Sequence, residues 1–484
     1  MRRSLFASAM LTIASPAVAG VWLEGGDRQT RADVETLAAA GLIRGPVNAW
    51  PLPWAQIVPA LSSIGTQSPE VASAARRLRA LADRAGRPTR LEVRAAATNE
   101  SALIRDFGDT AREDAEISAR VEQEFGALTL SLGAGYRSSQ QGRDWHFEPS
   151  SATLKLGNWA LYGGYVDVWH GPGNNGALLF SNAARPFPKI GIKRLSPDAF
   201  DLPVLKWLGP WRFDAFAGVL TGHRRDFDNP AVIGFRFGFA PAAGLEIGLN
   251  RALQLCGQQR PCSAKVIGNA LVGFGNADNS GTANEPGNQI AGWDISYTSR
   301  IGAVAAKVYL EGEAEDEDNV IVDKYSYLGG VTLSGALGSA GNSWRAGFEW
   351  TDTLARKFPF GSTRYPGVTY THFIYTDGYT YRGRPIGFGV GGDARQLSLG
   401  LALTDPRDRR IYGALRRADL NRSGINISAI SANPERINIA VGGIELPTAV
   451  GDFRLEGRVQ DDSPNTPGYT QRKGQVEVAW RARF

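Results

Sequence analysis

From residue 89 to the end of the chain, apolar and polar residues alternate with a period of two. The alternation is clear at residues 91–97, 128–136, 233–239 and 397–403. Successive residues of a strand point to opposite faces, so this pattern predicts strands with one apolar and one polar face. It continues through the last ten residues, which end on the aromatic Phe484. Such a closing strand is typical of an outer-membrane barrel, whose apolar face meets lipid and whose polar face lines the lumen.

The connections between the predicted strands fall into a short set and a long set. With residues 90–98 as the first strand, the short connections are 125–127, 157–158, 241–244, 299–300, 405–408 and 446–449. The long connections are 101–114, 138–150, 169–187, 222–229, 255–288, 313–324, 353–392, 420–433 and 461–472. Short periplasmic turns and long outer loops characterise outer-membrane barrels. We therefore predict an all-β antiparallel barrel of about 18 strands over residues 89–484, least clearly marked between 187 and 210.

The first 88 residues differ from the rest. Residues 1–19 combine a basic start, an apolar core and an Ala-Val-Ala end, which predicts a secretory signal peptide. Residues 20–88 have helical spacing, so we expect a helix over 31–40 capped by Thr30, a short helix after Pro53, and a longer helix from Pro69 to Gly86. This small helical element would lie in the periplasm or in the barrel mouth as a plug. No stretch approaches the ~20 apolar residues of a membrane helix.

Composition supports this class and weakens others. The 484 residues include 58 Gly, 12 Trp, 14 Tyr and 21 Phe, and the mean hydropathy is only -0.22, as expected for strands that are apolar on one side. The net charge of +5, without any basic block, argues against nucleic acid as a partner. Most basic residues are Arg, whose planar guanidinium pairs with carboxylates and stacks on aromatic rings.

The two cysteines, Cys256 and Cys262, lie close together in one long connection. In an exported chain this spacing favours a local disulfide. A metal site would need further ligands, and none of the four histidines lies nearby in sequence, so we expect no metal. The acidic run over residues 311–319 offers oxygen ligands for Ca²⁺ or Mg²⁺, but it lacks calcium-loop spacing, and a solvated acidic loop tip is the favoured interpretation.

Two segments stand out for their chemistry. Residues 169–186 include a G-x-G-x-x-G pattern, yet no helix follows and no βαβ unit surrounds it, so a dinucleotide site is rejected. Gly and Pro there would instead fix unusual backbone conformations. Residues 370–387 hold four tyrosines, an Asp and two arginines, which suit a surface that stacks on carbohydrate and hydrogen-bonds to it. The alternative is a loop that packs on itself or plugs the lumen.

These segments, W-x-G-P-G-x-x-x-x-L-x-x-S-N-x-A-R-P and H-x-x-Y-x-D-G-Y-x-Y-x-G-R-x-I-G, resemble those of the capsule-assembly Wzi family. The resemblance implies an 18-stranded outer-membrane barrel closed by loops and a periplasmic helical element. It also implies a lectin-like role, in which exported capsular polysaccharide is held at the cell surface. Several relatives have His after the Ile-Gly, where this chain has Phe388.

The candidate ligand contacts come from both segments. If the polysaccharide is acidic, its carboxylates should meet arginine side chains beside aromatic rings. The expected glycan contacts are His170, Asn182, Arg185, Tyr379, Tyr381, Arg382 and Arg384. The residues expected to hold the shape of the loop are Trp169, Gly171, Pro172, Gly173 and Pro186. If these residues only hold the loop in shape and bind no glycan, Arg185 belongs with this second group.

The sequence contains neither H-E-x-x-H nor G-x-S-x-G, so we expect no enzyme and no cofactor. The leading hypothesis is an outer-membrane lectin that anchors and organises capsular polysaccharide at the cell surface. The alternative is a porin-type channel for small solutes or oligosaccharides, and a hydrolase is a third class. Expected partners are the capsular or exopolysaccharide, outer-membrane lipid and the polysaccharide export machinery, with the protein as a monomer.

Overall fold

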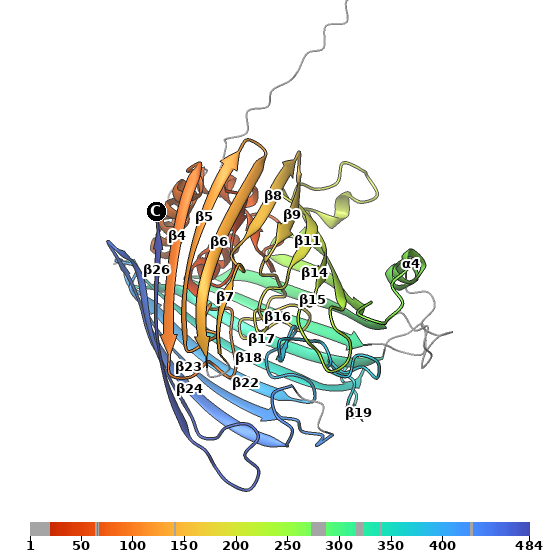
Figure 1. Cartoon of the computed structure of the whole chain (residues 1–484). Helices are drawn as coiled ribbons and strands as arrows, with labels where there is room; N and C mark the ends of the chain where they lie inside the picture. The colour runs from red at the N-terminus through yellow and green to blue at the C-terminus, as the bar shows by residue number, and fades with distance from the viewer. Residues whose placement is uncertain are drawn as a thin grey trace, which may run out of the picture.

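The computed structural model describes residues 20–62, 65, 67–139, 142–272, 287–315, 323–338, 341–425 and 429–484. Within these residues the chain forms a closed antiparallel barrel with the N-terminal helices gathered at one end (Figure 1). The predicted signal peptide, residues 1–19, lies outside the described residues. None of the described helices combines the length and apolarity needed to cross a membrane.

Neighbouring strands of the wall follow one another along the chain. They are β4 (Thr89–Thr98), β5 (Ala115–Phe125), β6 (Leu128–Ser139), β7 (Gly142–His146), β8 (Ser151–Leu156), β9 (Trp159–Gly164), β11 (Lys189–Arg194), β12 (Trp211–Val219), β13 (Ala231–Ala242), β14 (Leu245–Leu255), β15 (Gly287–Ile301), β16 (Val304–Glu315), β17 (Lys324–Leu337), β18 (Asn342–Lys357), β22 (Arg395–Thr404), β23 (Arg410–Leu420), β24 (Glu435–Thr448), β25 (Gly451–Gln460) and β26 (Lys473–Arg483). Strands β7 and β8 pair with different parts of β6, so together they count as one strand of the wall. Strand β19 (Arg364–Tyr365) only extends the pairing at the end of β18. The described wall therefore has the predicted 18 strands.

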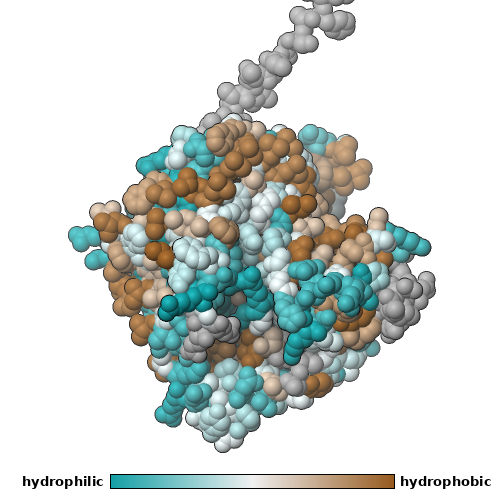
Figure 2. Space-filling view, in the orientation of Figure 1, coloured by the Kyte–Doolittle hydropathy of each residue, from teal (hydrophilic) through white to brown (hydrophobic). Residues whose placement is uncertain are grey.

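The barrel closes where β26 pairs with β4. The amide of Phe484 donates to the carbonyl of Leu91 at 2.8 Å, which continues this ladder to the last residue. Along β26, Val476 and Val478 are 55% and 49% exposed, whereas Glu477 between them is fully buried. The predicted alternation is thus confirmed: the valines cover the outer surface and the carboxylate points into the lumen. Apolar residues form brown areas over parts of the surface seen in Figure 2, and polar residues gather elsewhere on it.

Some predicted boundaries differ from the structure. The turns expected at 299–300 and 446–449 fall at 302–303 and 449–450, because the strand pattern continues past the predicted ends. The weakly marked region contains the six-residue strand β11 and a long connection, residues 195–210, that includes the 3-10 turn η1 (Lys206–Leu208). Three carboxylates expected at an acidic loop tip are instead buried side chains of β16, namely Glu311, Glu313 and Glu315. Residues 316–319 lie outside the described part of the chain.

The N-terminal helices are α1 (Arg28–Ala39), α2 (Trp54–Ser62) and α3 (Pro69–Ala85). The N-cap of α1 is Asp27, whose Oδ1 accepts from the amide of Thr30 at 2.7 Å, and not Thr30 itself. Helix α3 lies near the short turns, since Arg76 pairs with Asp408 at 2.7 Å. Short turns mark the periplasmic end of an outer-membrane barrel. The three helices, which we call the plug, are therefore at that end (Figure 1).

Charge pairs hold α1 against the lumen wall. Glu35 of α1 is buried and accepts from Lys307 Nζ of β16 at 2.9 Å, and it also pairs with Arg345 of β18. Within α1, Arg31 Nε lies 3.3 Å from the same carboxylate. Burial alone would raise the pKa of Glu35, but Arg345, Lys307 and Arg31 hold this pKa well below its usual range. Glu35 is therefore an anion that several cations require.

We predict that Glu35→Ala loosens the plug and leaves the barrel folded. Removing one partner of a buried ion pair leaves an uncompensated charge and costs about 3–5 kcal/mol. The measurement is trypsin cleavage within residues 20–88 at increasing urea, with heat-modifiable gel mobility as the test of an intact barrel. Arg76→Ala is the control, because its side chain is 53% exposed and such pairs contribute about 1 kcal/mol or less. Equal protection of the two variants would contradict the prediction.

Candidate functional site

Long connections at the outer end fold back into the lumen. In the connection after β9, β10 (Trp169–His170) pairs with β2 (Ala49–Trp50), which belongs to the N-terminal region before α2. In the connection after β18, β20 (Thr380–Tyr381) and β21 (Arg384–Pro385) form a hairpin. Its turn residues Arg382 and Gly383 both have positive φ, as expected for the two central positions of a type I′ turn. The amide of Ser181 donates to the carbonyl of Ile386 at 3.0 Å, so these two inward loops also contact each other.

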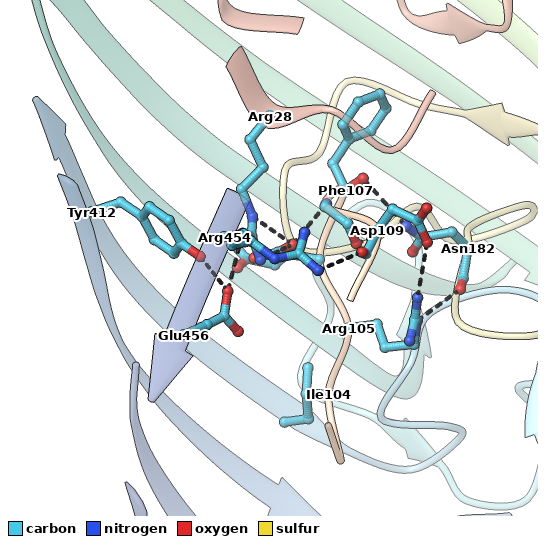
Figure 3. Close-up of polar contacts among 12 residues, drawn as sticks. Arg28, Ile104, Arg105, Phe107, Asp109, Asn182, Tyr412, Arg454 and Glu456 are labelled. Carbon is cyan, nitrogen blue, oxygen red and sulfur yellow. Dashed lines mark hydrogen bonds and ion pairs between the residues drawn. The ribbon is translucent and has the colours of Figure 1, made fainter. Parts of the chain in front are cut away.

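The connection between β4 and β5, residues 99–114, reaches the plug (Figure 3). Arg28 of α1 donates from Nε to Asp106 Oδ1 at 3.0 Å and from Nη1 to Glu456 Oε2 of β25 at 3.1 Å. The amide of Asp109 donates to the carbonyl of Gly26 at 2.8 Å. Burial opposes ionisation of Asp106, but Arg28 and Arg416 hold its pKa below the usual range. An outer loop, a plug helix and the barrel wall therefore share one charged network.

An aromatic cluster lies beside this network. The ring of Phe107 packs edge-on against Trp50 and Trp169, with ring centroids 5.2 and 5.1 Å apart. The guanidinium of Arg31 lies 4.5 Å from the centroid of the Phe107 ring. Edge-to-face aromatic pairs at these distances stabilise by about 0.5–1.5 kcal/mol beyond their burial. Residues 99–114, the plug and residues 165–188 thus meet at one apolar junction.

The glycine-rich motif holds its loop in close contact with its surroundings. A Cβ on Gly171, whose φ is 149°, would lie 2.7 Å from Glu311 Oε2, and one on Gly173 would lie 2.3 Å from the carbonyl oxygen of Gly176. The carbonyl of Pro172 accepts from Arg31 Nη2 at 2.8 Å. These contacts favour the structural interpretation of Trp169, Gly171, Pro172 and Gly173. Pro186 lines the lumen cavity described below.

The structure places His170 in the interior, with no exposed surface. Its Nε2 lies 3.3 Å from Asp214 Oδ2, and its ring packs against Phe180 and Phe216. Burial lowers the pKa of His170 to about 4, although Asp214 acts in the opposite direction. The imidazole is therefore neutral at pH 7 and does not face the outer surface.

Two more expected contacts are buried and a third is half-buried. Tyr379 and Tyr381 are 0% and 3% exposed, and the hydroxyl of Tyr381 lies 3.0 Å from Thr221 Oγ1. Asn182 donates from Nδ2 to the carbonyl of Phe107 at 3.3 Å. These side chains connect the inward loops to each other and to the wall. In the described conformation, a ligand at the outer surface would not reach the two tyrosine rings.

The arginines differ in how they are neutralised. Arg185 pairs with Glu113 and with Glu148, the latter at 3.1 Å. Arg382 is 44% exposed and 3.8 Å from Glu148. Arg384 donates from Nη1 to the carbonyl of Leu103 at 3.2 Å. The three arginines that the sequence groups together therefore have different surroundings in the structure.

Arg112 was missed by the sequence analysis and lies in the same region. It donates from Nη1 to the carbonyl of Ala184 at 2.7 Å. Within the described residues, no carboxylate oxygen lies within 4.0 Å of Arg112 or Arg384. Burial lowers the pKa of both groups, and the charge of Arg112 lowers that of Arg384 further. Both guanidinium groups would gain from a nearby anion, and no motif in the sequence marks Arg112.

A cavity of about 290 Å³ lies between the plug, the inward loops and the wall. Its lining extends from Phe484 near the periplasmic end to Arg185 on an outer loop. Both ring nitrogens of His146, which also lines it, are buried without a hydrogen-bond partner. Further lining residues toward the outer end are Arg112, Glu116, Glu148, Tyr165 and Asp167. Hydroxyl-rich ligands suit such a lining of charged groups, an imidazole and an aromatic ring.

Two remaining features are the pairing of the cysteines and the arrangement of possible metal ligands. Cys256 and Cys262 form a disulfide with a Cα–Cα distance of 4.9 Å, in the connection after β14. In the part of the chain that the structure describes, no group of three His, Cys, Asp or Glu side chains is arranged to hold a metal ion.

Comparison with known proteins places the chain in a family. The model of the family described as capsule assembly protein Wzi matches residues 84–481. The chain belongs to this family. An uncharacterized 55.8 kDa protein from the cps region of Klebsiella pneumoniae is 28% identical over 330 residues, covering 66% of this chain and 63% of that protein. The match therefore spans less than two thirds of the relative's length.

A solved structure shares the fold of this chain. Wzi of Escherichia coli, an outer membrane protein involved in group 1 capsule assembly and described as a carbohydrate-binding β-barrel, aligns with a TM-score of 0.80 and 23% identity. The alignment covers 96% of this chain and 100% of that chain. Pseudomonas aeruginosa OpdQ aligns with a TM-score of 0.43 and 9% identity over 82% of this chain and 97% of that chain.

We predict that His170 titrates near pH 4 and destabilises the fold in acid. Its pKa of about 4 in the folded state lies below the ordinary value of about 6.5, so the unfolded state binds more protons between these values. Stability should therefore fall as the pH drops from about 6.5 to 4, by up to about 3 kcal/mol from this group. The measurement is NMR titration of ¹³C-labelled histidine, with the signal assigned by His170→Gln. A midpoint near 6.5 would mean a solvated ring.

Proposed function

We propose that this protein is a non-enzymatic, lectin-like protein of the outer membrane that binds exported capsular polysaccharide and organises it at the cell surface. Membership of the capsule assembly family supports this proposal, as does the barrel shared with carbohydrate-binding Wzi. The observation that carries it is the pair Arg112 and Arg384, whose guanidinium groups have no carboxylate oxygen within 4.0 Å among the described residues. The polysaccharide export machinery is the partner that would deliver the ligand.

We assign ligand contact first to the arginines of the inward loops. An acidic sugar could place a carboxylate between Arg112 and Arg384, with Arg382 and Arg185 beside it. Charge-assisted hydrogen bonds of this kind are shorter and stronger than neutral ones. The buried side chains of His170, Tyr379 and Tyr381 and the half-buried side chain of Asn182 would support the site from behind. Tyr165 and His146, in the lumen cavity, are additional candidates for stacking and hydrogen bonding.

A porin-type channel is the alternative function. The plug and inward loops occupy the lumen: Glu35 is buried against Lys307 and Arg345, and Phe107 is buried between two tryptophans. An open pore would require these contacts to break. Planar-bilayer recording separates the two functions, since steady large conductance would favour a channel and silence would favour a lectin.

We predict that Arg384→Ala and Arg112→Ala each weaken polysaccharide binding and keep the barrel folded. Each charged hydrogen bond contributes about 1.5–3 kcal/mol, which corresponds to a loss of roughly 10- to 100-fold in affinity. The measurement is binding of purified variants to capsular polysaccharide, with heat-modifiable gel mobility as the folding test. Arg436→Ala is the control, because it removes the same charge from a side chain that is 59% exposed and paired with Asp419.

Two outcomes would contradict the assignment. If both variants fold and bind normally, these arginines are not part of the site. If each variant loses its gel shift together with binding, the arginines have a structural role.

In a capsulated host, deletion of the gene should release polysaccharide into the medium while total synthesis persists. Unchanged cell-bound capsule, together with no binding by the purified protein, would refute the proposed function itself.

A further inference from the structure

The connection between β11 and β12, residues 195–210, is at the periplasmic end of the barrel. Its two ends contact the N-terminal region, since Pro197 and Pro210 lie beside Gly45, whereas its middle lies on the outside of the wall. Gly238 of β13 faces inward, since its Cβ position is 3.3 Å from Pro46 of the N-terminal region, so the next residue, Phe239, faces outward. Trp207 packs edge-on against Phe239 with ring centroids 6.1 Å apart. Phe200 stacks on Trp211 at 4.3 Å and 7°. The connection therefore covers outward-facing rings of β12 and β13.

The same connection exposes apolar side chains. Leu202, Val204 and Trp207 are 61%, 81% and 64% exposed. Exposed apolar residues that lie close together mark an interaction surface, whereas single ones are ordinary. We call these three residues the lower patch, where lower means toward the periplasm, the end drawn at the top of Figure 1.

A second apolar surface lies at the outer end of the same wall. Helix α4 (Ala264–Val272) follows the disulfide loop and packs, through Ala270, on the outward residues Leu253 and Leu255 of β14, which are 0% and 1% exposed. Arg251 of β14 donates to the carbonyls of Ala270 and Leu271, both at 2.8 Å, and so holds the C-terminal end of the helix.

Helix α4 keeps apolar residues uncovered as well. Leu271 and Val272 remain 40% and 62% exposed. We call these two residues the upper patch. Helix α4, which carries the upper patch, and the connection that carries the lower patch project from the same side of the barrel in Figure 1.

Strand β13 gives the spacing between the patches. Its residue Phe239 packs under Trp207, and its residues Ala231 and Ile233 pack in the cluster with α4. Eight residues separate Phe239 from Ala231, which is about 26 Å along a strand. With the usual tilt of about 40°, this is about 20 Å across the membrane, close to the apolar band of about 25 Å. The patches thus lie near the two membrane–water interfaces.

We infer that the lower and upper patches are lipid-binding sites that clamp the β12–β14 wall at both bilayer interfaces. The occupant is membrane lipid, at the boundary between headgroup and acyl chain. Both patches are continuous with the outer surface of strands that already face lipid, where Leu249 of β14 is 52% exposed. Trp at the interface, and a helix lying in the interface plane with its apolar side chains in lipid, are known anchors of this kind. This inference is independent of polysaccharide binding.

The test is depth-dependent quenching of a single fluorophore in lipid vesicles. Val204→Cys and Val272→Cys are labelled with bimane without reductant, because both native cysteines are in the disulfide. Tyr469→Cys is the matched control, since Tyr469 is 64% exposed in an outer connection that carries neither patch. Lipids with a doxyl group near the headgroup should quench positions 204 and 272 strongly and position 469 weakly. Doxyl groups at the bilayer centre should quench positions 204 and 272 less than the shallow ones do.

Other outcomes would overturn the inference. Quenching at 204 and 272 no stronger than at 469 would mean that the patches do not meet lipid. Disulfide crosslinks between the introduced cysteines of two copies, together with weak quenching, would identify a second copy of the chain as the occupant. A variant carrying both Leu202→Asp and Val204→Asp gives a second measurement. The unmodified protein should have a higher Tm in vesicles than in detergent. The variant should keep the gel shift of a folded barrel but show a smaller rise in Tm between the two, and an unchanged rise would also refute the inference.

Discussion

The polar inner face of the barrel is the constraint on which the rest of the structure depends. Strands that present apolar residues to lipid necessarily present their alternate residues to the lumen, and many of these are charged here. Lys307 and Arg345 would lose the carboxylate that they share if Glu35 of the plug were absent, and each would keep only a neutral asparagine oxygen as an acceptor. Removing one partner of such a pair costs several kcal/mol. Charge pairing therefore explains why this lumen is filled and which surface of α1 faces the wall.

The apolar junction at Phe107 adds specificity to this pairing. Trp50 comes from the N-terminal region, Trp169 from the loop after β9 and Phe107 from the loop after β4. Rings packed edge to face fix the orientation of the segments that carry them, whereas charge pairs alone fix it less strictly. The loops that would hold polysaccharide are thereby joined to the periplasmic helices through direct contacts. A rigid support of this kind suits a binding protein whose ligand is a long, mobile polymer.

Strands could be predicted from the sequence because each obeys a local rule of alternation, which the closing strand up to Phe484 follows except at the inward-facing Ala479. Boundaries were harder: alternation continued through 299–300, and both Asp27 and Thr30 are competent helix caps. The site was predicted from residue type, which selects Arg384 as a candidate but cannot tell that His170 is covered. Burial of a loop residue depends on contacts between distant segments, and no local pattern encodes these.

The ion pair between Arg28 and Glu456 joins side chains 428 positions apart. Its two halves belong to the first helix and to a strand next to the closing one, so it can form only when the wall is nearly complete. Closing so long a loop costs conformational entropy, so a contact of this kind is slow to form. The first helix, although it is synthesised early, can therefore dock through Arg28 only onto a wall that already contains Glu456. The nearly complete barrel is in this sense the template on which the helix settles.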